Sequence, residues 1–230
     1  MPTDHMDARH HFAESLEEVK TGMLELGGLV LENTRRMGEA LLENRLDLAR
    51  AVVVADEEID TRYARLEFRV FEIMARQQPV AGDLRFLVAA TRILYEIERS
   101  GDLAVNGAKG LLRRDGYTLP PQIHSLVARL ARGSADLFAD GLEALRSLDP
   151  DAAPVIDRAD DEVDTVVGEL YGVVAKNSEH IGFDLAMELT RIGRYLERIA
   201  DHAVNIAEHV TFVVTGSFPG GESAVTRDEA

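Results

Sequence analysis

Two stretches of this sequence carry the same acidic pattern. Residues 97–106 read IERSGDLAVN, and residues 196–205 read LERIADHAVN. In each stretch a Glu, an Asp and an Asn follow one another at four-residue spacing, which places their side chains on one face of an α-helix. These residues are Glu98, Asp102 and Asn106 in the first stretch, and Glu197, Asp201 and Asn205 in the second.

A second acidic pattern comes earlier in each half of the chain. Residues 55–60 read ADEEID and residues 159–164 read ADDEVD, so each contains two Asp residues four positions apart. They are Asp56 and Asp60, then Asp160 and Asp164. If the two helices of each half pack antiparallel, four carboxylates converge, with a formal charge of about −4 that like-charge repulsion opposes.

Such a cluster is stabilised either by protonation, with raised pKa values, or by a bound cation. The sequence contains no cysteine, so any metal must be held by oxygen or imidazole ligands. Carboxylates suit magnesium, calcium, manganese or iron, and zinc also accepts them. More than one ion could share a cluster. Glu208 extends the acidic stripe of the second half.

Two other interpretations of these carboxylates remain open. Arg99 and Arg198 directly follow the two Glu residues, so the acids could form exposed ion pairs worth about 0–1 kcal/mol each on a metal-free helical scaffold. Alternatively, paired ions could activate water in a metallohydrolase that acts on phosphate esters, with Arg92 or Arg191 binding the substrate.

We nevertheless expect a protein that is not an enzyme. The sequence has no GxxxxGK[ST], GxSxG, HExxH or Glu-x-x-His motif, which are patterns of common catalytic centres. Local spacing places no base beside Ser100 or Thr91. His202 has Leu103 as its counterpart in the first half, so we expect it to be an ordinary histidine at the surface or at an edge.

The spacing of apolar residues predicts an all-α fold. Seven prolines lie at probable element boundaries, and between them the apolar residues recur at helical period, with no sustained alternation of strand type. We predict six helices, at about 8–44, 47–77, 82–114, 120–148, 151–178 and 181–214. Asp83 and Asp184 are expected to be N-caps or first-turn acids of the third and sixth helices.

The duplicated patterns divide this helical chain into two repeats. ADEEID and ADDEVD are offset by 104 positions (56 against 160), and the later stretches by 99 (98 against 197). We assign the five missing residues to the loop between the fifth and sixth helices, because loops tolerate deletions. The sequence thus predicts two tandem three-helix units, at 8–116 and 117–215, followed by a flexible tail at 216–230.

The composition limits the kinds of partner that this protein can bind. The net charge of −16 argues against binding to nucleic acid or to anionic lipid. The N-terminal residues MPTDHMDARHHF lack the basic and apolar regions of a secretory signal. No apolar run approaches the length of about 20 residues that spans a bilayer. We therefore expect a soluble cytoplasmic protein.

Taken together, these motifs resemble those of the PhoU family, the accessory proteins of phosphate-specific ABC transporters. The resemblance spans residues 9–215 and rests on ADEEID, ARQQPVAGDLR (75–85), IERSGD and AVN, then ADDEVD and LERIADHAVNIAE. It implies two three-helix bundles related by pseudo-twofold symmetry, with multinuclear metal clusters on the [ED]xxxD motifs. The residues that match are Asp56, Asp60, Glu98 and Asp102, then Asp160, Asp164, Glu197 and Asp201, with Asn106 and Asn205 as supporting groups.

The two sites are not expected to be equal. Glu208 of the second half has Lys109 as its counterpart in the first, so the first site should be less negative and bind fewer ions. The resemblance also implies a regulatory role: a homodimer that connects the transporter ATPase to the phosphate-sensing histidine kinase and represses phosphate-starvation signalling and phosphate uptake. Such a protein would reach the membrane only peripherally, through its partners.

Overall fold

The protein is all-α, as predicted. The structure, a computed structural model, describes residues 2–218, with side chains from residue 11 onward. This part contains six helices and no strand: α1 (Pro2–Glu43), α2 (Leu46–Gln77), α3 (Ala81–Arg113), α4 (Pro121–Ser147), α5 (Ala153–Ile181) and α6 (Phe183–Thr215). Within the same range, no helix has an apolar stretch long enough to cross a bilayer.

Proline and residues with positive φ define several helix ends. α4 begins at Pro121, where the missing N–H has no intrahelical partner to lose. α2 ends before Gln78, which has a φ of 46° and is followed by Pro79. α6 ends before Gly216, which has a φ of 81° and donates its N–H to the carbonyl of Phe212. Asp83 and Asp184 are first-turn acids rather than N-caps.

The link between the last two helices of each repeat differs from the prediction. α5 continues to Ile181 rather than 178. Elsewhere, α1 also differs from the prediction and begins at Pro2 rather than at 8. Residues 78–80 connect α2 to α3, whereas Gly182 alone connects α5 to α6. The loop therefore accounts for two of the five missing residues. The other three form the first turn of α3, residues 81–83, which α6 lacks because Phe183 corresponds to Leu84.

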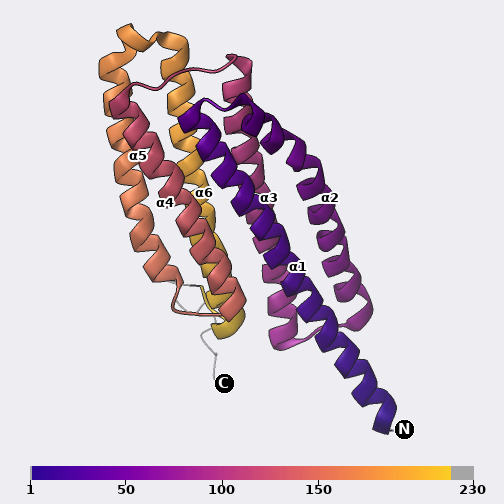
Figure 1. Ribbon diagram of the computed structural model, residues 1–230. Coiled ribbons are helices and arrows are strands. Elements are labelled where there is room, and N and C mark those ends of the chain that lie inside the picture. Colours follow the sequence, from indigo (N-terminus) through magenta and orange to yellow (C-terminus); the bar gives the residue numbers. More distant parts are fainter. Residues whose placement is uncertain (1, 219–230) are drawn as a thin grey trace.

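The helices form two three-helix bundles that pack side by side (Figure 1). In the described part of the chain, α2 contacts only α1 and α3, and α5 contacts only α4 and α6. The bundles meet where α1 packs on α4 and α3 packs on α6. This pattern is unchanged when the first three helices are exchanged with the last three, as pseudo-twofold symmetry requires.

The central helices approach closely and share one apolar core that runs through both bundles. A Cβ placed on Gly38 of α1 would lie 3.0 Å from the Cβ of Ala131 on α4. One placed on Gly141 of α4 would lie 3.0 Å from the carbonyl oxygen of Ala203 on α6. Larger side chains at Gly38 would separate α1 from α4, where the bundles meet, and at Gly141 would separate α4 from α6 within the second bundle.

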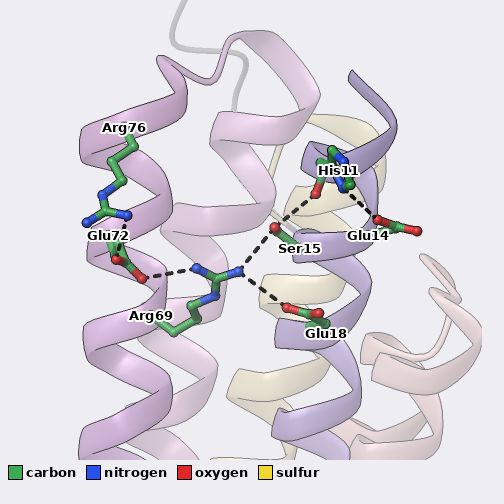
Figure 2. A network of polar contacts seen from close by, with 7 residues as sticks. All are labelled: His11, Glu14, Ser15, Glu18, Arg69, Glu72 and Arg76. Carbon is green, nitrogen blue, oxygen red and sulfur yellow. Dashed lines mark hydrogen bonds and ion pairs between the residues drawn. The ribbon is translucent and has the colours of Figure 1, made fainter. Parts of the chain in front are cut away.

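Polar contacts tie the exposed N-terminal part of α1 to α2 (Figure 2). The Arg69 guanidinium of α2 donates to Ser15 Oγ at 3.2 Å and to Glu18 Oε2 at 3.3 Å. Its other terminal nitrogen donates to Glu72, which also accepts from Arg76. Glu18 and Arg76 are largely exposed and Arg69 is partly exposed, so these ion pairs add little stability.

Most of the predicted tail, residues 219–230, lies outside the described residues. Its first residues, 216–218, do not extend away from the protein. The Phe218 ring stacks on Phe212 with a centroid distance of 4.7 Å, and it meets His209 edge-on at 5.6 Å. The chain therefore turns back onto the end of α6.

Candidate metal centres

The first acidic cluster forms where α2 and α3 run side by side. Burial raises the pKa of Asp56, and the charges of Asp60 and Asp102 raise it further. Burial also raises the pKa of Glu98, followed by the effects of Asp102, Asp60 and Asp56. Each carboxylate thus lies in the field of acids on the opposite helix. Asp56, Asp60, Glu98 and Asp102 thus face one another across α2 and α3, and their convergence on one ion stays a prediction.

In the second cluster, between α5 and α6, the pKa values of the carboxyl groups are more strongly raised. Burial and then the charges of Asp201 and Asp164 raise the pKa of Asp160 to about 7. Asp160 Oδ1 is buried and has no hydrogen-bond partner. Burial and Glu197 raise the pKa values of both Asp164 and Asp201. Negative charge that nearby arginines offset only in part is therefore concentrated around Asp160.

Further residues make the clusters unequal. Asp157, which the motifs did not identify, adds to the rise in pKa of Asp160, and after burial it is the effect that raises the pKa of Glu208. Its position three residues before Asp160, on the same helix face, was the available signal. In the first cluster the Lys109 ammonium has the opposite effect and lowers the pKa of Asp56.

The two Asn residues have different surroundings. Asn106 is exposed on α3. Asn205 lies beside Glu96 of α3, and its side-chain hydrogen bond lowers the pKa of Glu96, against the larger raising effect of burial. Asn205 therefore contacts the other bundle. A supporting role for either Asn at a metal site stays a prediction.

Arginines accompany several of the acids. Arg99 donates to Asp102 at 3.0 Å, and Arg194 lies 2.6 Å from Glu197. Arg198 lies 3.9 Å from Asp201. In this arrangement, no group of three or more acidic or histidine side chains among the described residues is close enough to hold one metal ion. The carboxylates would have to rotate away from their arginines to share an ion.

The residues present nevertheless fit hard cations. The donor set consists of carboxylates, which are the preferred ligands of such ions. The buried, unpartnered oxygen of Asp160 and the raised pKa values of its neighbours mark a place where positive charge would be stabilising. The competing arginines are about half exposed. Exchanging such pairs costs only about 0–1 kcal/mol each.

The prediction for His202 was wrong. The side chain is only 3% exposed and lies between α3 and α6, where Nδ1 is 2.9 Å from Ser100 Oγ and Nε2 is 3.6 Å from Glu96 Oε2. Burial, together with Arg198 and Arg99, lowers the pKa of His202 to about 4. Ser100 therefore has a histidine partner that its local sequence did not reveal. Because both side chains are buried, the pair joins the bundles and is not accessible to a substrate.

Comparison with known proteins places this arrangement in a family. The model of the PhoU domain matches residues 23–111 and again residues 127–210, one match in each predicted repeat. The chain belongs to the PhoU family. The predicted boundaries at 8–116 and 117–215 enclose these matches.

Relatives resemble the chain over nearly its full length. The phosphate-specific transport system accessory protein PhoU homolog 1 of Mycobacterium leprae is 37% identical, over 92% of this chain and 96% of the relative. PhoU homolog 2 of Mycobacterium tuberculosis is 36% identical, over 92% and 100%. The crystal structure of PhoU from Pseudomonas aeruginosa superposes with a TM-score of 0.84 at 27% identity, covering 90% of this chain and all of that one.

A second solved structure supports the same fold. The phosphate transport system regulatory protein PhoU from Streptococcus pneumoniae gives a TM-score of 0.81 at 25% identity, covering 90% of this chain and 98% of that one. The resemblance deduced from the motifs is thus confirmed, and so is the fold of two three-helix bundles.

Proposed function

We propose that this protein represses phosphate-starvation signalling and phosphate uptake. It would act in the cytoplasm as an adaptor between the phosphate transporter ATPase and the phosphate-sensing histidine kinase, as a homodimer. The observation that carries the proposal is the close similarity, over 92% of the chain, to proteins named accessory proteins of the phosphate-specific transport system. The absence of a recognised catalytic motif from the sequence favours action by binding rather than by catalysis.

Deletion of the gene tests this role. Phosphate-starvation genes should then be expressed in phosphate-rich medium, and a copy of the gene supplied in trans should repress them again. If those genes stay silent after deletion, with transporter and kinase intact, the regulatory role is wrong.

We further propose that the two carboxylate clusters bind hard metal ions, such as iron, manganese, magnesium or calcium, with zinc also compatible. Bound ions would neutralise the acids and cross-link α2 to α3 and α5 to α6. Asp160 and Asp201 would supply ligands in the second cluster, and Asp56 and Asp102 in the first. The buried, unpartnered oxygen of Asp160 supports this assignment most directly.

Elemental analysis of protein purified without an affinity tag tests the metal proposal. At least one equivalent of metal per chain should copurify, and removing it with a chelator should lower the melting temperature. Substoichiometric metal, with no thermal effect of the chelator, would instead favour the metal-free scaffold, in which the arginines alone neutralise the acids.

A further inference from the structure

An apolar stripe continues from the first acidic cluster along the outer side of α2 and α3. On α3, Leu84, Val88 and Tyr95 are 42%, 43% and 51% exposed. Their spacing places them on the same helix face as Glu98 and Asp102. On α2, Tyr63 and Phe71 lie three and eleven positions after Asp60, which places all three on one helix face. We call the group Tyr63, Phe71, Leu84, Val88 and Tyr95 the α2–α3 seam.

The seam is continuous with the acids. Tyr63 donates to Glu67 Oε1 at 2.7 Å. Burial, this hydrogen bond and the charges of Glu67, Glu98 and Tyr95 raise the pKa of Tyr63 to about 12. Tyr63 and Tyr95 therefore lie near each other, next to Glu98. The seam thus has an aromatic middle, an apolar end at Leu84 and Val88, and an acidic end at the first cluster.

The second half differs at the three aromatic positions of this surface. The counterparts of Tyr63 and Phe71 are Val167 and Ala175, at the 104-residue offset. The counterpart of Tyr95, at the 99-residue offset, is Arg194, which pairs with Glu197 at 2.6 Å. Both repeats fold alike, so aromatic side chains at these three positions in only one of them are not required by the fold. They indicate a contact that only the first half makes.

We propose that the α2–α3 seam binds a helical segment of another protein, apolar on one face and rich in Lys or Arg at the end that meets Asp56, Asp60, Glu98 and Asp102 when these carboxylates hold no metal ion. From Leu84 to Asp102 the helix rise gives about 27 Å, the length of a helix of about five turns. An amphipathic helix in a groove anchors through residues at i, i+4 and i+7. Complementary charge at one end fixes the direction in which it lies.

Other occupants fit this surface less well. A second copy of the chain in parallel orientation would bring two acidic clusters together. In antiparallel orientation each cluster of the metal-free protein would be buried against apolar side chains without a cation, which is costly for ionised carboxylates. Anionic lipid would be repelled by the same cluster. A separate protein segment with cationic residues avoids all three penalties.

This inference deepens the proposed adaptor function, and it rests on that function only for the view that the occupant belongs to a signalling partner. Binding to the seam can be measured without it. The probe is a synthetic helical peptide of about 18 residues with Leu on one face and Lys at one end, labelled for fluorescence anisotropy in buffer with chelator. A matched peptide carries Glu in place of Lys, and another has the same composition in scrambled order.

The residues of the second half suggest conservative substitutions for the first half. Tyr95→Arg with Phe71→Ala gives the first half the residues that the second half already has at Arg194 and Ala175, so folding should be preserved, as circular dichroism would verify. We expect the Lys peptide to bind more tightly than both matched peptides, and the double variant to weaken it at least about tenfold. Phe183→Ala, which removes an exposed apolar side chain of the second half at the position that corresponds to Leu84, should change binding less than twofold.

The inference would be overturned by equal binding of the Lys and Glu peptides, or by no effect of the double variant. Loss of a dimer in the double variant would also overturn it, because a second copy would then be the occupant. Seam-dependent binding to vesicles of neutral and anionic phospholipid would also overturn it. The gene-deletion experiment is scored separately. Failure of repression with intact peptide binding would reject the signalling role and leave the seam as a helix-binding surface.

Discussion

Ser100 Oγ on α3 lies 2.9 Å from Nδ1 of His202 on α6, and both side chains are buried where the two bundles meet. Ser100 stands between Glu98 and Asp102, and His202 directly follows Asp201. The same helical turns therefore present acids to the outside and a hydrogen-bonded pair to the inside. This relationship connects the packing of the bundles to the position of both acidic clusters.

Replacing His202 with Ala should lower the free energy of unfolding by about 2–4 kcal/mol. The change leaves the Ser100 hydroxyl without one partner and opens a cavity between α3 and α6. Urea unfolding at neutral pH measures the loss, and His124→Ala, which removes an exposed histidine of α4, is the control. Equal effects of the two substitutions would show that the buried pair contributes no specific stability.

Acidification should weaken the folded state through His202. Its folded pKa of about 4 lies below the ordinary histidine value of 6.5, so the unfolded chain binds more protons between these values. The stability contributed by neutral His202 is fully present above pH 6.5 and is lost as the pH falls toward 4. Unfolding free energies of the parent and His202→Ala proteins, compared at pH 7 and pH 4.5, should converge as the pH falls. A constant difference would contradict this expectation.

The contribution of Asp160 to stability has the opposite pH dependence. Its folded pKa of about 7 lies above the ordinary aspartate value of 3.8, so in the metal-free protein its stabilising contribution is present below pH 3.8 and is lost as the pH rises through 7. Asp160→Asn should therefore stabilise the metal-free protein at pH 8. Since the side chain is partly exposed, we expect a gain of about 1 kcal/mol, or about 2–4 °C in melting temperature.

Thermal melts in chelator at pH 8 and pH 5 measure this gain, which should shrink at pH 5. Asp151→Asn, at an exposed position before α5, serves as the control. Destabilisation at pH 8 by the Asp160 substitution would mean that the charged carboxylate is already compensated within the chain. The proposed metal site would then lose its main support.

The inequality of the clusters predicts a gain of metal binding. Lys109→Glu removes the cation that lowers the pKa of Asp56 and supplies a carboxylate where the second half has Glu208. Titration with Mn²⁺ should show tighter binding at the first cluster, by about tenfold or more, because a site of higher negative charge attracts a divalent ion more strongly. Lys176→Glu, on the exposed side of α5, controls for net charge. Equal gains in the two variants would indicate a general charge effect.

The sequence was sufficient for the features that depend on local spacing. Six helices follow from apolar period, and each cluster follows from i, i+4 acids on two consecutive antiparallel helices. The environment of His202 could not be predicted in this way, because it depends on contact with Ser100, 102 positions away, across the bundle boundary. Comparison with Leu103 was misleading, since the two repeats have different side chains at this position. Asp157 was missed because it lies outside the duplicated motif.

A last prediction concerns Glu188, whose side chain is 1% exposed between α6 and α3. Its carboxylate lies 3.0 Å from Arg191 and 3.8 Å from both Arg113 and Arg114. A Cβ on Gly110 would overlap this carboxylate. Gly110→Ala should therefore displace a buried charge from its arginines and lower the free energy of unfolding by about 3–5 kcal/mol.

The matched control is Gly168→Ala on α5, where a Cβ meets nothing within 4 Å. That substitution should stabilise the protein by about 0.5–1 kcal/mol, since alanine favours the helix interior over glycine. Urea unfolding of both variants checks the opposite signs. Because only the absence of a Cβ admits Glu188 beside α3, the double variant Gly110→Ala with Glu188→Ala should recover part of the loss. Strict additivity of the two substitutions would refute this coupling.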